Sequence, residues 1–185
     1  MPAREPDTLE EYYRLGLTYQ ELTRLTLSKP FNYQTNFNRT DLTEEDRRFF
    51  AGLPTLKTIL IAEPWCGDVV SILPVIARAF DGHDQLETRV LLRSKYPRLI
   101  ERYLSKGKRS VPKAVFLDEN YREIAVWGPR PLAAQEIYDR YADISSTVVR
   151  DTVLFVKIKE FYRIDRGREV LDELKGLLRP FLRSC

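Results

Sequence analysis

The chain has 185 residues, of which 43% are hydrophobic and 31% are charged, and its formal net charge is +3. This length suits one domain with appended elements, and the near balance of 30 basic and 27 acidic residues does not indicate a nucleic-acid-binding protein. No run of about 18 apolar residues predicts a transmembrane helix, and the first residues do not resemble a secretory signal. Two cysteines exclude a disulfide scaffold, so the expected location is the reducing cytoplasm.

Residues 1–54 are predicted to form an N-terminal helical extension. An apolar face over residues 7–28 predicts one helix, and a second helix is predicted over residues 43–53. Residues 30–40, which are rich in asparagine, threonine and aromatic residues, are interpreted as a loop. The aromatic side chains of this extension make it a candidate lid over a site in the following region. They are Tyr12, Tyr13, Tyr19, Phe31, Tyr33 and Phe37.

Residues 55–143 alternate between strand and helix patterns, which predicts an α/β core. The predicted order is strand, helix, strand, helix, strand, strand, helix, and the last two strands form a hairpin around residues 118–120. Alternation implies parallel pairing at first, and the hairpin adds an antiparallel strand. The strands are expected over 56–62, 86–92, 114–117 and 121–127, and the helices over 66–80, 96–104 and 131–141.

Residues 144–185 are predicted to form a C-terminal helical extension of two helices, with a break near residues 165–167. The first of these helices is apolar over most of its circumference, which indicates docking either within the protein or against a partner. We favour packing on the core, which would give one compact domain overall. The apolar residues are Val153, Leu154, Val156, Ile158, Phe161 and Tyr162.

The most informative motif is Trp65-Cys66-Gly67, which follows an apolar strand and opens a helix. Thiol–disulfide proteins present a reactive sulfur in this way, because a helix N-terminus favours the thiolate. The fourth position of the Cys-x-x-Cys pattern is Val69, so no disulfide can close within the motif. Asp68 places a carboxylate near the sulfur, so we expect a net lowering of the thiol pKa that is smaller than in a dithiol site.

Further residues stand at positions that match thioredoxins. Pro74 lies eight residues after Cys66, Val111-Pro112 precedes the third core strand, and Gly128 follows Pro112 by 16 residues. Together with Trp-Cys-Gly, these residues resemble the thioredoxin-like superfamily. The variant Trp-Cys-Gly-Asp, flanked by helical extensions, resembles a bacterial branch of that superfamily whose substrate is unassigned.

The resemblance implies a thioredoxin fold, a central mixed sheet flanked by helices, with N-terminal and C-terminal helical extensions. It also implies that Cys66 is the nucleophile and that a groove beside a cis-Pro112 holds an extended substrate. The chain departs from thioredoxins at Asp68, at Val69 and at Leu60, which stands where thioredoxins have a buried aspartate. The candidate catalytic residue is Cys66, and the candidate substrate-binding residues are Trp65, Gly67, Asp68, Val111 and Pro112.

Two functions from different classes are open. The first is a monothiol redox protein in which Cys66 takes part in thiol–disulfide exchange, forms a mixed disulfide or is oxidised to a sulfenic acid, with an external thiol as the resolving partner. The second is a non-catalytic binding module that uses the groove beside Pro112, with Cys66 as an inert relic. The expected partners are proteins or low-molecular-weight thiols and disulfides. No cofactor, metal, nucleic acid or membrane is expected, and the protein is predicted to be a monomer or a weak homodimer.

Three other features have less specific interpretations. Cys185 is either a resolving thiol or an ordinary terminal cysteine. Residues 89–113 carry nine basic residues against the single acid Glu101, which indicates either a solvated face or a surface that attracts an acidic partner. Tyrosines interleaved with these basic residues make nucleic acid a weak alternative. His83 is the only histidine, and its distance from the cysteines along the chain does not fit a metal site.

Overall fold

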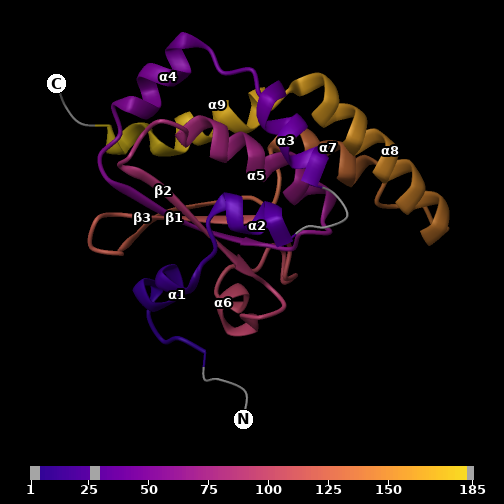
Figure 1. The fold of residues 1–185 in the computed structure, drawn as a ribbon. Coiled ribbons are helices and arrows are strands. Elements are labelled where there is room, and N and C mark those ends of the chain that lie inside the picture. The colour runs from indigo at the N-terminus through magenta and orange to yellow at the C-terminus, as the bar shows by residue number, and fades with distance from the viewer. Residues whose placement is uncertain (1–4, 26–29, 183–185) are drawn as a thin grey trace.

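The computed structural model describes residues 5–25 and 30–182 of the chain (Figure 1). Within these residues the centre is a four-stranded sheet with the strand order β2-β1-β3-β4. The strands are β1 (Leu56–Ala62), β2 (Leu86–Leu92), β3 (Lys113–Leu117) and β4 (Glu123–Trp127). β1 pairs in parallel with β2 and antiparallel with β3, and β3 pairs antiparallel with β4. The predicted mixed sheet is therefore confirmed.

Helices flank the sheet, as predicted for this α/β fold. They are α1 (Leu9–Leu15), α2 (Tyr19–Leu25), α3 (Pro30–Arg39), α4 (Glu44–Ala51), α5 (Gly67–Phe80), α6 (Pro97–Glu101), α7 (Leu132–Arg140), α8 (Thr147–Asp165) and α9 (Arg168–Leu178), and a 3₁₀ turn (Arg179–Phe181) follows α9. In the view of Figure 1, α4, α5 and α9 lie above the sheet, and α1 and α6 lie below it. None of the helices in the described ranges combines the length and the apolar character needed to cross a membrane.

β1 occupies the centre of the sheet because its side chains are buried on both faces. Leu60 pairs with Val90 of β2 on one side and with Ala114 of β3 on the other. Every side chain from Thr58 to Ala62 is buried, as expected for a strand covered on both faces. The motif around Cys66 therefore follows directly after the end of a rigid, buried strand.

The predicted helix over residues 7–28, whose last three residues lie outside the described part of the chain, is interrupted between α1 and α2. There the backbone N–H of Leu17 donates to the carbonyl of Val90 at 2.9 Å, and the N–H of Val90 donates to the carbonyl of Leu17 at 2.7 Å. In a continuous helix, the backbone N–H and carbonyl of Leu17 would instead form hydrogen bonds within the helix. Gly16 permits the close approach, because a Cβ at this position would lie 2.5 Å from the Cβ of Arg89.

The predicted loop over residues 30–40 is wrong, because the structure has helix α3 there. Asparagine and threonine are weak helix formers, so tertiary packing stabilises this helix. The side chain of Tyr33 is fully buried, and the side-chain amide of Asn36 donates a 2.9 Å hydrogen bond to the carbonyl of Val70 in α5. α3 therefore packs against the helix that begins after Cys66.

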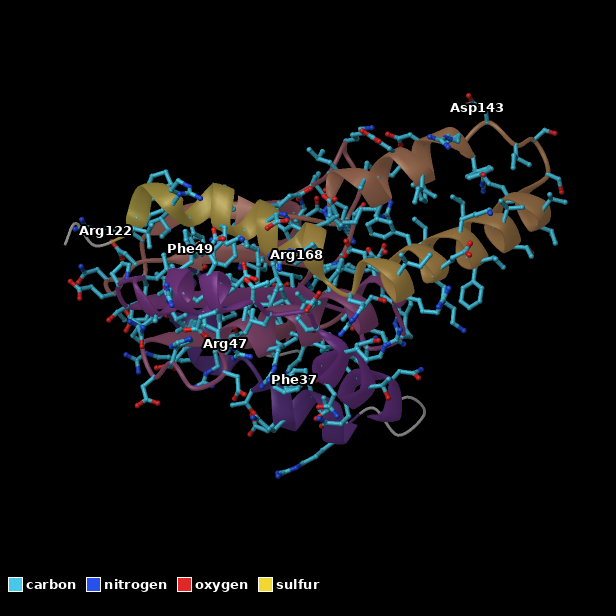
Figure 2. The ribbon with its side chains drawn as sticks, turned by 90° about the horizontal axis from the view of Figure 1, so that it is seen from above. Phe37, Arg47, Phe49, Arg122, Asp143 and Arg168 are labelled. Carbon is cyan, nitrogen blue, oxygen red and sulfur yellow. The ribbon has the colours of Figure 1, made fainter. Side chains whose placement is uncertain are left out.

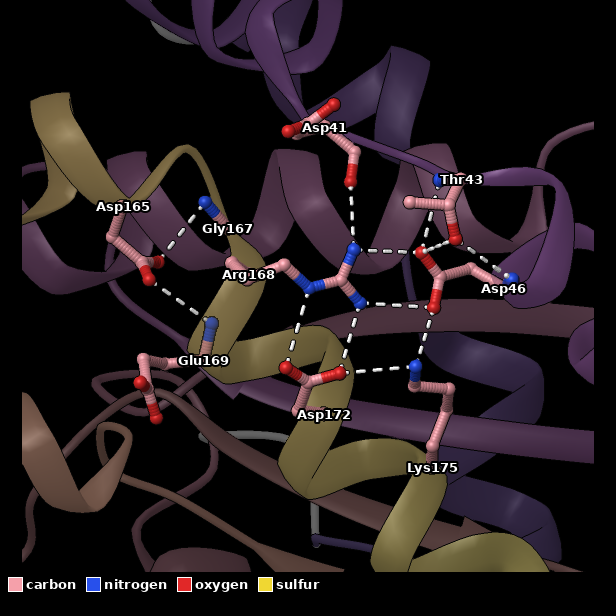
Figure 3. A network of polar contacts seen from close by, with 9 residues as sticks. All are labelled: Asp41, Thr43, Asp46, Asp165, Gly167, Arg168, Glu169, Asp172 and Lys175. Atoms are coloured by element: carbon pink, nitrogen blue, oxygen red, sulfur yellow. Dashed lines mark hydrogen bonds and ion pairs between the residues drawn. The ribbon is translucent and has the colours of Figure 1, made fainter.

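A buried carboxylate joins the helices before the core to those after it (Figure 3). Asp46 in α4 accepts hydrogen bonds from Arg168 at 2.7 and 2.9 Å and pairs with Lys175 at 2.6 Å, both in α9. It also accepts a 2.7 Å hydrogen bond from the hydroxyl of Thr43, the N-cap residue of α4. Asp172 pairs with the same two cations. The two helical extensions are thus in direct contact.

α7 and α8 form a helical hairpin that projects from the rest of the molecule, with Asp143 at its tip (Figure 2). Within α8 only Leu154 is buried, whereas Val148 and Phe155 are 77% and 65% exposed. The prediction that the C-terminal extension packs on the core as one compact domain stays a prediction, and α8 contributes few buried side chains to such packing. α8 lies against α7 and reaches the core through its last turns, where Tyr162 bonds to α5.

Candidate thiol site at the start of α5

Cys66 stands at the N-cap position of α5, directly after the turn that follows β1. Its backbone N–H donates a 3.0 Å hydrogen bond to the carbonyl of Glu63. The buried carboxylate of Glu63 accepts a 2.6 Å hydrogen bond from the backbone N–H of Ser94, which follows β2. The turn that presents the sulfur is therefore fixed to the ends of two adjacent parallel strands.

The loop beside the sulfur contains the predicted cis peptide bond between Val111 and Pro112. The thiol of Cys66 donates a hydrogen bond to the carbonyl of Val111, with Sγ 3.6 Å from the oxygen. Gly128 has a φ of 103°, and a Cβ at this position would lie 2.6 Å from the carbonyl oxygen of Pro112. The residues that the resemblance singled out in this loop and after β4 therefore meet next to Cys66.

Pro74 lies inside α5, at the position that the sequence predicts. Proline has no backbone N–H, so the carbonyl of Val70, four residues earlier, lacks its helical donor. The side chain of Asn36 in α3 takes the place of that donor, with a hydrogen bond of 2.9 Å. α3 is thereby part of the scaffold of the thiol site, a role that the interpretation of residues 30–40 as a loop missed.

Asp68, a predicted substrate-binding residue, is 8% exposed and both of its carboxylate oxygens are bonded within the protein. Oδ2 accepts hydrogen bonds from Nη2 and Nε of Arg130 at 2.6 and 3.1 Å, and Oδ1 accepts a 2.8 Å hydrogen bond from the hydroxyl of Tyr162. Arg130 also donates to Gln135 and lies over the ring of Tyr138, in α7. These contacts give Asp68 a positioning role, since they fix the first turn of α5 to α7 and α8. Its contact with a substrate stays a prediction.

Sequence reasoning missed Arg130 and Tyr162. Arg130 follows the cis peptide bond between Gly128 and Pro129, at the end of the last core strand. The motif lies at the same edge of the sheet, so an ion pair between Arg130 and Asp68 could have been predicted from the sequence. Tyr162 carries no comparable signal, since nothing in the pattern of α8 distinguishes it from the other apolar positions.

The predicted lowering of the Cys66 pKa is wrong, because the pKa of this thiol is raised above its ordinary value. Burial is the largest cause, since it disfavours the charged thiolate. The charge of Asp68 adds to the rise, whereas hydrogen bonds from the backbone N–H groups of Val69 and Asp68 and the charge of Arg130 oppose it. The resting sulfur is consequently a protonated thiol at neutral pH.

Trp65 and Gly67 are the neighbours of Cys66 in the chain, and both leave room for an approaching molecule. Trp65 is 63% exposed, and the guanidinium of Arg93 lies 5.4 Å from the centroid of its indole ring. A Cβ at Gly67 would meet no atom within 4 Å. The exposed indole ring and a neighbouring cation therefore lie beside Cys66, and the contact of Trp65 and Gly67 with a substrate stays a prediction.

Part of the N-terminal extension lies beside the thiol. The buried hydroxyl of Tyr33 donates a 3.3 Å hydrogen bond to the carbonyl of Pro64, and the hydroxyl of Tyr19 donates to the carbonyl of Tyr33, also at 3.3 Å. Burial raises the pKa of Tyr33, and the negative charge of a Cys66 thiolate raises it further. Phe37 stacks on Tyr19. Tyr33 therefore contacts the turn that leads to the sulfur, and Tyr19 and Phe37 pack behind Tyr33.

The other aromatic residues of the candidate lid lie elsewhere or are not described. Tyr12 and Tyr13 in α1 donate hydrogen bonds to Glu5 and Glu87. The side chain of Phe31 lies outside the described part of the chain. Opening and closing of this extension over the site stays a prediction.

The basic residues between 89 and 113 do not form one solvated face. Arg93 donates a 2.9 Å hydrogen bond to the carbonyl of Arg109, which itself pairs with Glu101. Lys113 is buried, donates a 2.7 Å hydrogen bond to the carbonyl of Gly128, and has a pKa lowered by that burial. Several of these cations therefore support the loop that contains the cis-proline.

The remaining candidates add no group to the site. His83 lies in the loop after α5, and the described residues contain no cluster of three histidine, cysteine or acidic side chains suited to a metal ion. Cys185 lies outside the described residues, so a resolving role for it stays a prediction.

The strand order of the sheet, together with a helix-capping cysteine beside a cis-proline, defines a thioredoxin-fold protein. A family model described as thioredoxin matches residues 18–143, which is more than half of the chain. The chain therefore belongs to the thioredoxin family, as the motif around Cys66 predicts. No curated protein sequence matches the chain.

Two solved structures share this fold over nearly the whole chain. The crystal structure of an HIV epitope scaffold has a TM-score of 0.72 and 12% sequence identity, and the match covers 94% of this chain and 99% of that one. A protein of unknown function from Pseudomonas aeruginosa has a TM-score of 0.71 and 10% identity, with 95% and 99% covered. At these identities the likeness shows the fold alone.

Proposed function

We propose that the protein is a monothiol redox protein that carries out thiol–disulfide exchange through Cys66. The observation that carries this proposal is the position of the sulfur, which caps α5 and lies 3.6 Å from the Val111 carbonyl of the cis-proline loop. Two backbone N–H groups of the first turn of α5 favour the thiolate once it forms. Val69 stands at the position of the usual second thiol and has none, so we assign the resolving step to an external thiol.

The exchange takes place in two balanced steps. In the first, the Cys66 thiolate attacks one sulfur of a substrate disulfide, a mixed disulfide forms, and the other substrate sulfur leaves and takes up the proton that Cys66 lost. In the second, the thiolate of an external thiol attacks the substrate sulfur of the mixed disulfide. Cys66 then leaves and is protonated again. The net reaction replaces one sulfur partner of the substrate by another and regenerates the thiol.

The raised pKa of Cys66 limits the first step in the free protein, because only the thiolate attacks. A substrate that lies along the cis-proline loop would compete for the Val111 carbonyl that now accepts the hydrogen bond of the thiol. Such a substrate, either a protein or a low-molecular-weight disulfide, would react with Cys66 faster than with a free thiol of the same pKa in solution.

A second candidate function is a non-catalytic binding module that holds an extended peptide beside Pro112. Two observations favour it: burial raises the pKa of Cys66, and Asp68 is bonded to Arg130 and Tyr162. In this case the loop around Pro112 binds the peptide and the sulfur does not react.

The test is the formation of a mixed disulfide with glutathione disulfide, in a Cys185→Ser background so that Cys66 is the single thiol. We expect a stoichiometric adduct by intact mass, located at Cys66 by peptide mapping and removed by dithiothreitol. A Cys66→Ser variant is the matched control. An unreactive thiol in the folded protein, with no adduct after prolonged incubation up to pH 9, would overturn the redox proposal and leave the binding module.

A further inference from the structure

One side of α8 is apolar and exposed. It consists of Val148, Val149, Thr152, Phe155 and Val156, which we call the α8 stripe. The steps of three and four residues place these side chains on one side of the helix. All four hydrophobic members are more than half exposed, whereas Leu154 on the opposite side is buried. An apolar stripe on a projecting hairpin indicates an interaction surface.

The α8 stripe has the same spacing in both directions from Thr152. Val148 and Val156 lie four residues on either side of it, and Val149 and Phe155 lie three residues on either side. A two-fold axis beside Thr152 would bring Val148 of one copy against Val156 of the other, and Val149 against Phe155. A two-fold interface requires this kind of self-complementary surface.

Charges at the ends of the α8 stripe fit the same arrangement. Lys159 continues the stripe by one turn, with its ammonium 5.7 Å from the ring centroid of Phe155. In an antiparallel pair centred on Thr152, Lys159 faces residue 145 of the other copy, two residues from Asp143 at the hairpin tip (Figure 2). A cation and a carboxylate therefore lie near each other at both ends of the pair.

We propose that the α8 stripe is the interface of a homodimer in which two α8 helices pack antiparallel about Thr152. A single pair of helices buries less than the roughly 800 Å² per partner of a standard interface. The dimer is therefore weak, with a dissociation constant in the range of about 10–100 μM. This interface goes beyond the proposed function, since it does not depend on the chemistry of Cys66.

The geometry allows a direct test by cross-linking. Packed helices have axes about 8–10 Å apart and Cα radii of about 2.3 Å, which leaves roughly 3.4–5.4 Å between two Cα atoms that face each other. The upper part of this range, above about 4.4 Å, suits a disulfide. We expect a Thr152→Cys variant, in a Cys66→Ser and Cys185→Ser background, to form a covalent dimer under mild oxidation at protein concentrations above the dissociation constant.

The matched control is Lys157→Cys in the same background. Lys157 is on the other side of α8, and its side chain is 49% exposed, so its reactivity with small oxidants is comparable. We expect cross-linking at position 152 to be at least tenfold faster than at position 157. Equal rates at the two positions would show that only random collisions occur and would overturn the proposal.

Sedimentation of the chain without these cysteine substitutions gives a second readout. We expect a concentration-dependent dimer, and a Phe155→Asp variant, whose exposed position leaves the fold intact, should raise the dissociation constant by at least about tenfold. A chain that is monomeric at several hundred micromolar overturns the proposal. If that monomer instead floats with anionic lipid vesicles, and Phe155→Asp does not, the stripe is a lipid-binding surface.

Discussion

The hydroxyl of Tyr162 donates a 2.8 Å hydrogen bond to the carboxylate of Asp68, across 94 positions of the sequence. The same carboxylate pairs with Arg130 at 2.6 Å. The first turn of the helix that carries the thiol is therefore held by a residue of the C-terminal extension and by a residue that follows the last core strand. The chemistry of Cys66 depends on residues far outside its motif.

An Asp68→Asn substitution should lower the pKa of Cys66. It removes a negative charge that raises this pKa, and it frees the positive charge of Arg130, which lowers it. The rate of iodoacetamide alkylation against pH, in a Cys185→Ser background, should therefore have its midpoint at lower pH. Tyr162→Phe is the conservative control, since it keeps both charges, and should shift the midpoint less. A midpoint that moves upward in Asp68→Asn would contradict this account.

The bond between Asn36 and Val70 should stabilise the protein only while Pro74 is present. Asn36→Ala leaves the Val70 carbonyl without a donor, and we expect the free energy of unfolding in urea to fall by about 1–2 kcal/mol. Pro74→Ala restores the backbone N–H that bonds this carbonyl within α5. In the Pro74→Ala background, Asn36→Ala should therefore lower the free energy of unfolding by clearly less than it does in the original chain. Equal losses in both backgrounds would show that the two residues act independently.

Gly128→Ala should be strongly destabilising, because φ at this position is 103° and the new Cβ would meet the Pro112 carbonyl. We expect a loss of about 2–3 kcal/mol in the free energy of unfolding. Gly67→Ala is the matched control: no atom lies within 4 Å of its added Cβ, and the change should stay within about 0.5 kcal/mol. Similar losses for the two variants would count against the close approach of Gly128 to the cis-proline loop.

Asp46→Asn should make the protein less stable at neutral pH by about 3 kcal/mol, because it leaves Arg168 and Lys175 without their shared buried carboxylate. Burial alone would raise the pKa of Asp46, but hydrogen bonds from Arg168, Lys175 and Thr43 outweigh it and hold the pKa well below its ordinary value. The measurement is urea unfolding of both proteins at several pH values.

The sign of the pH dependence follows from the depressed pKa. The stability that the ionised Asp46 contributes is fully present above its unfolded-state pKa of about 4, and it is lost as the pH falls through the lower folded-state pKa. The free energy of unfolding should therefore drop more steeply below about pH 4 in the original chain than in Asp46→Asn. Parallel curves would mean that this carboxylate does not change its pKa on folding.

The structural features that could be predicted from the sequence are those that a short stretch of neighbouring residues determines. The apolar run of β1, the cysteine at the start of α5 and the cis-proline before β3 each stand in a short pattern, and the structure confirms all three. α3 was missed because its sequence of asparagines and threonines favours a loop, and the bond from Asn36 to α5 outweighs that preference.

The electrostatics of the thiol could not be predicted for a related reason. The pattern around Cys66 shows the helix N-terminus that lowers a pKa, but burial of the sulfur is a property of the assembled fold. The partners of Asp68 likewise come from Arg130 and Tyr162, which only the folded chain brings together. The direction of the pKa shift was therefore wrong although the position of the cysteine was right.

The sparse burial of α8 has a consequence for hydrogen exchange. Leu154 is the one buried side chain of α8, so local opening of this helix exposes little apolar surface. The free energy of opening, measured by hydrogen exchange of backbone amides, should therefore be lower for α8 than for β1. Each such opening that reaches Tyr162 also breaks its hydrogen bond to Asp68 in the first turn of α5, and Asp68 then keeps only its pairing with Arg130. Local opening of the loosely packed helix α8 therefore changes the polar contacts next to Cys66, although Cys66 itself lies at the end of the well-packed sheet.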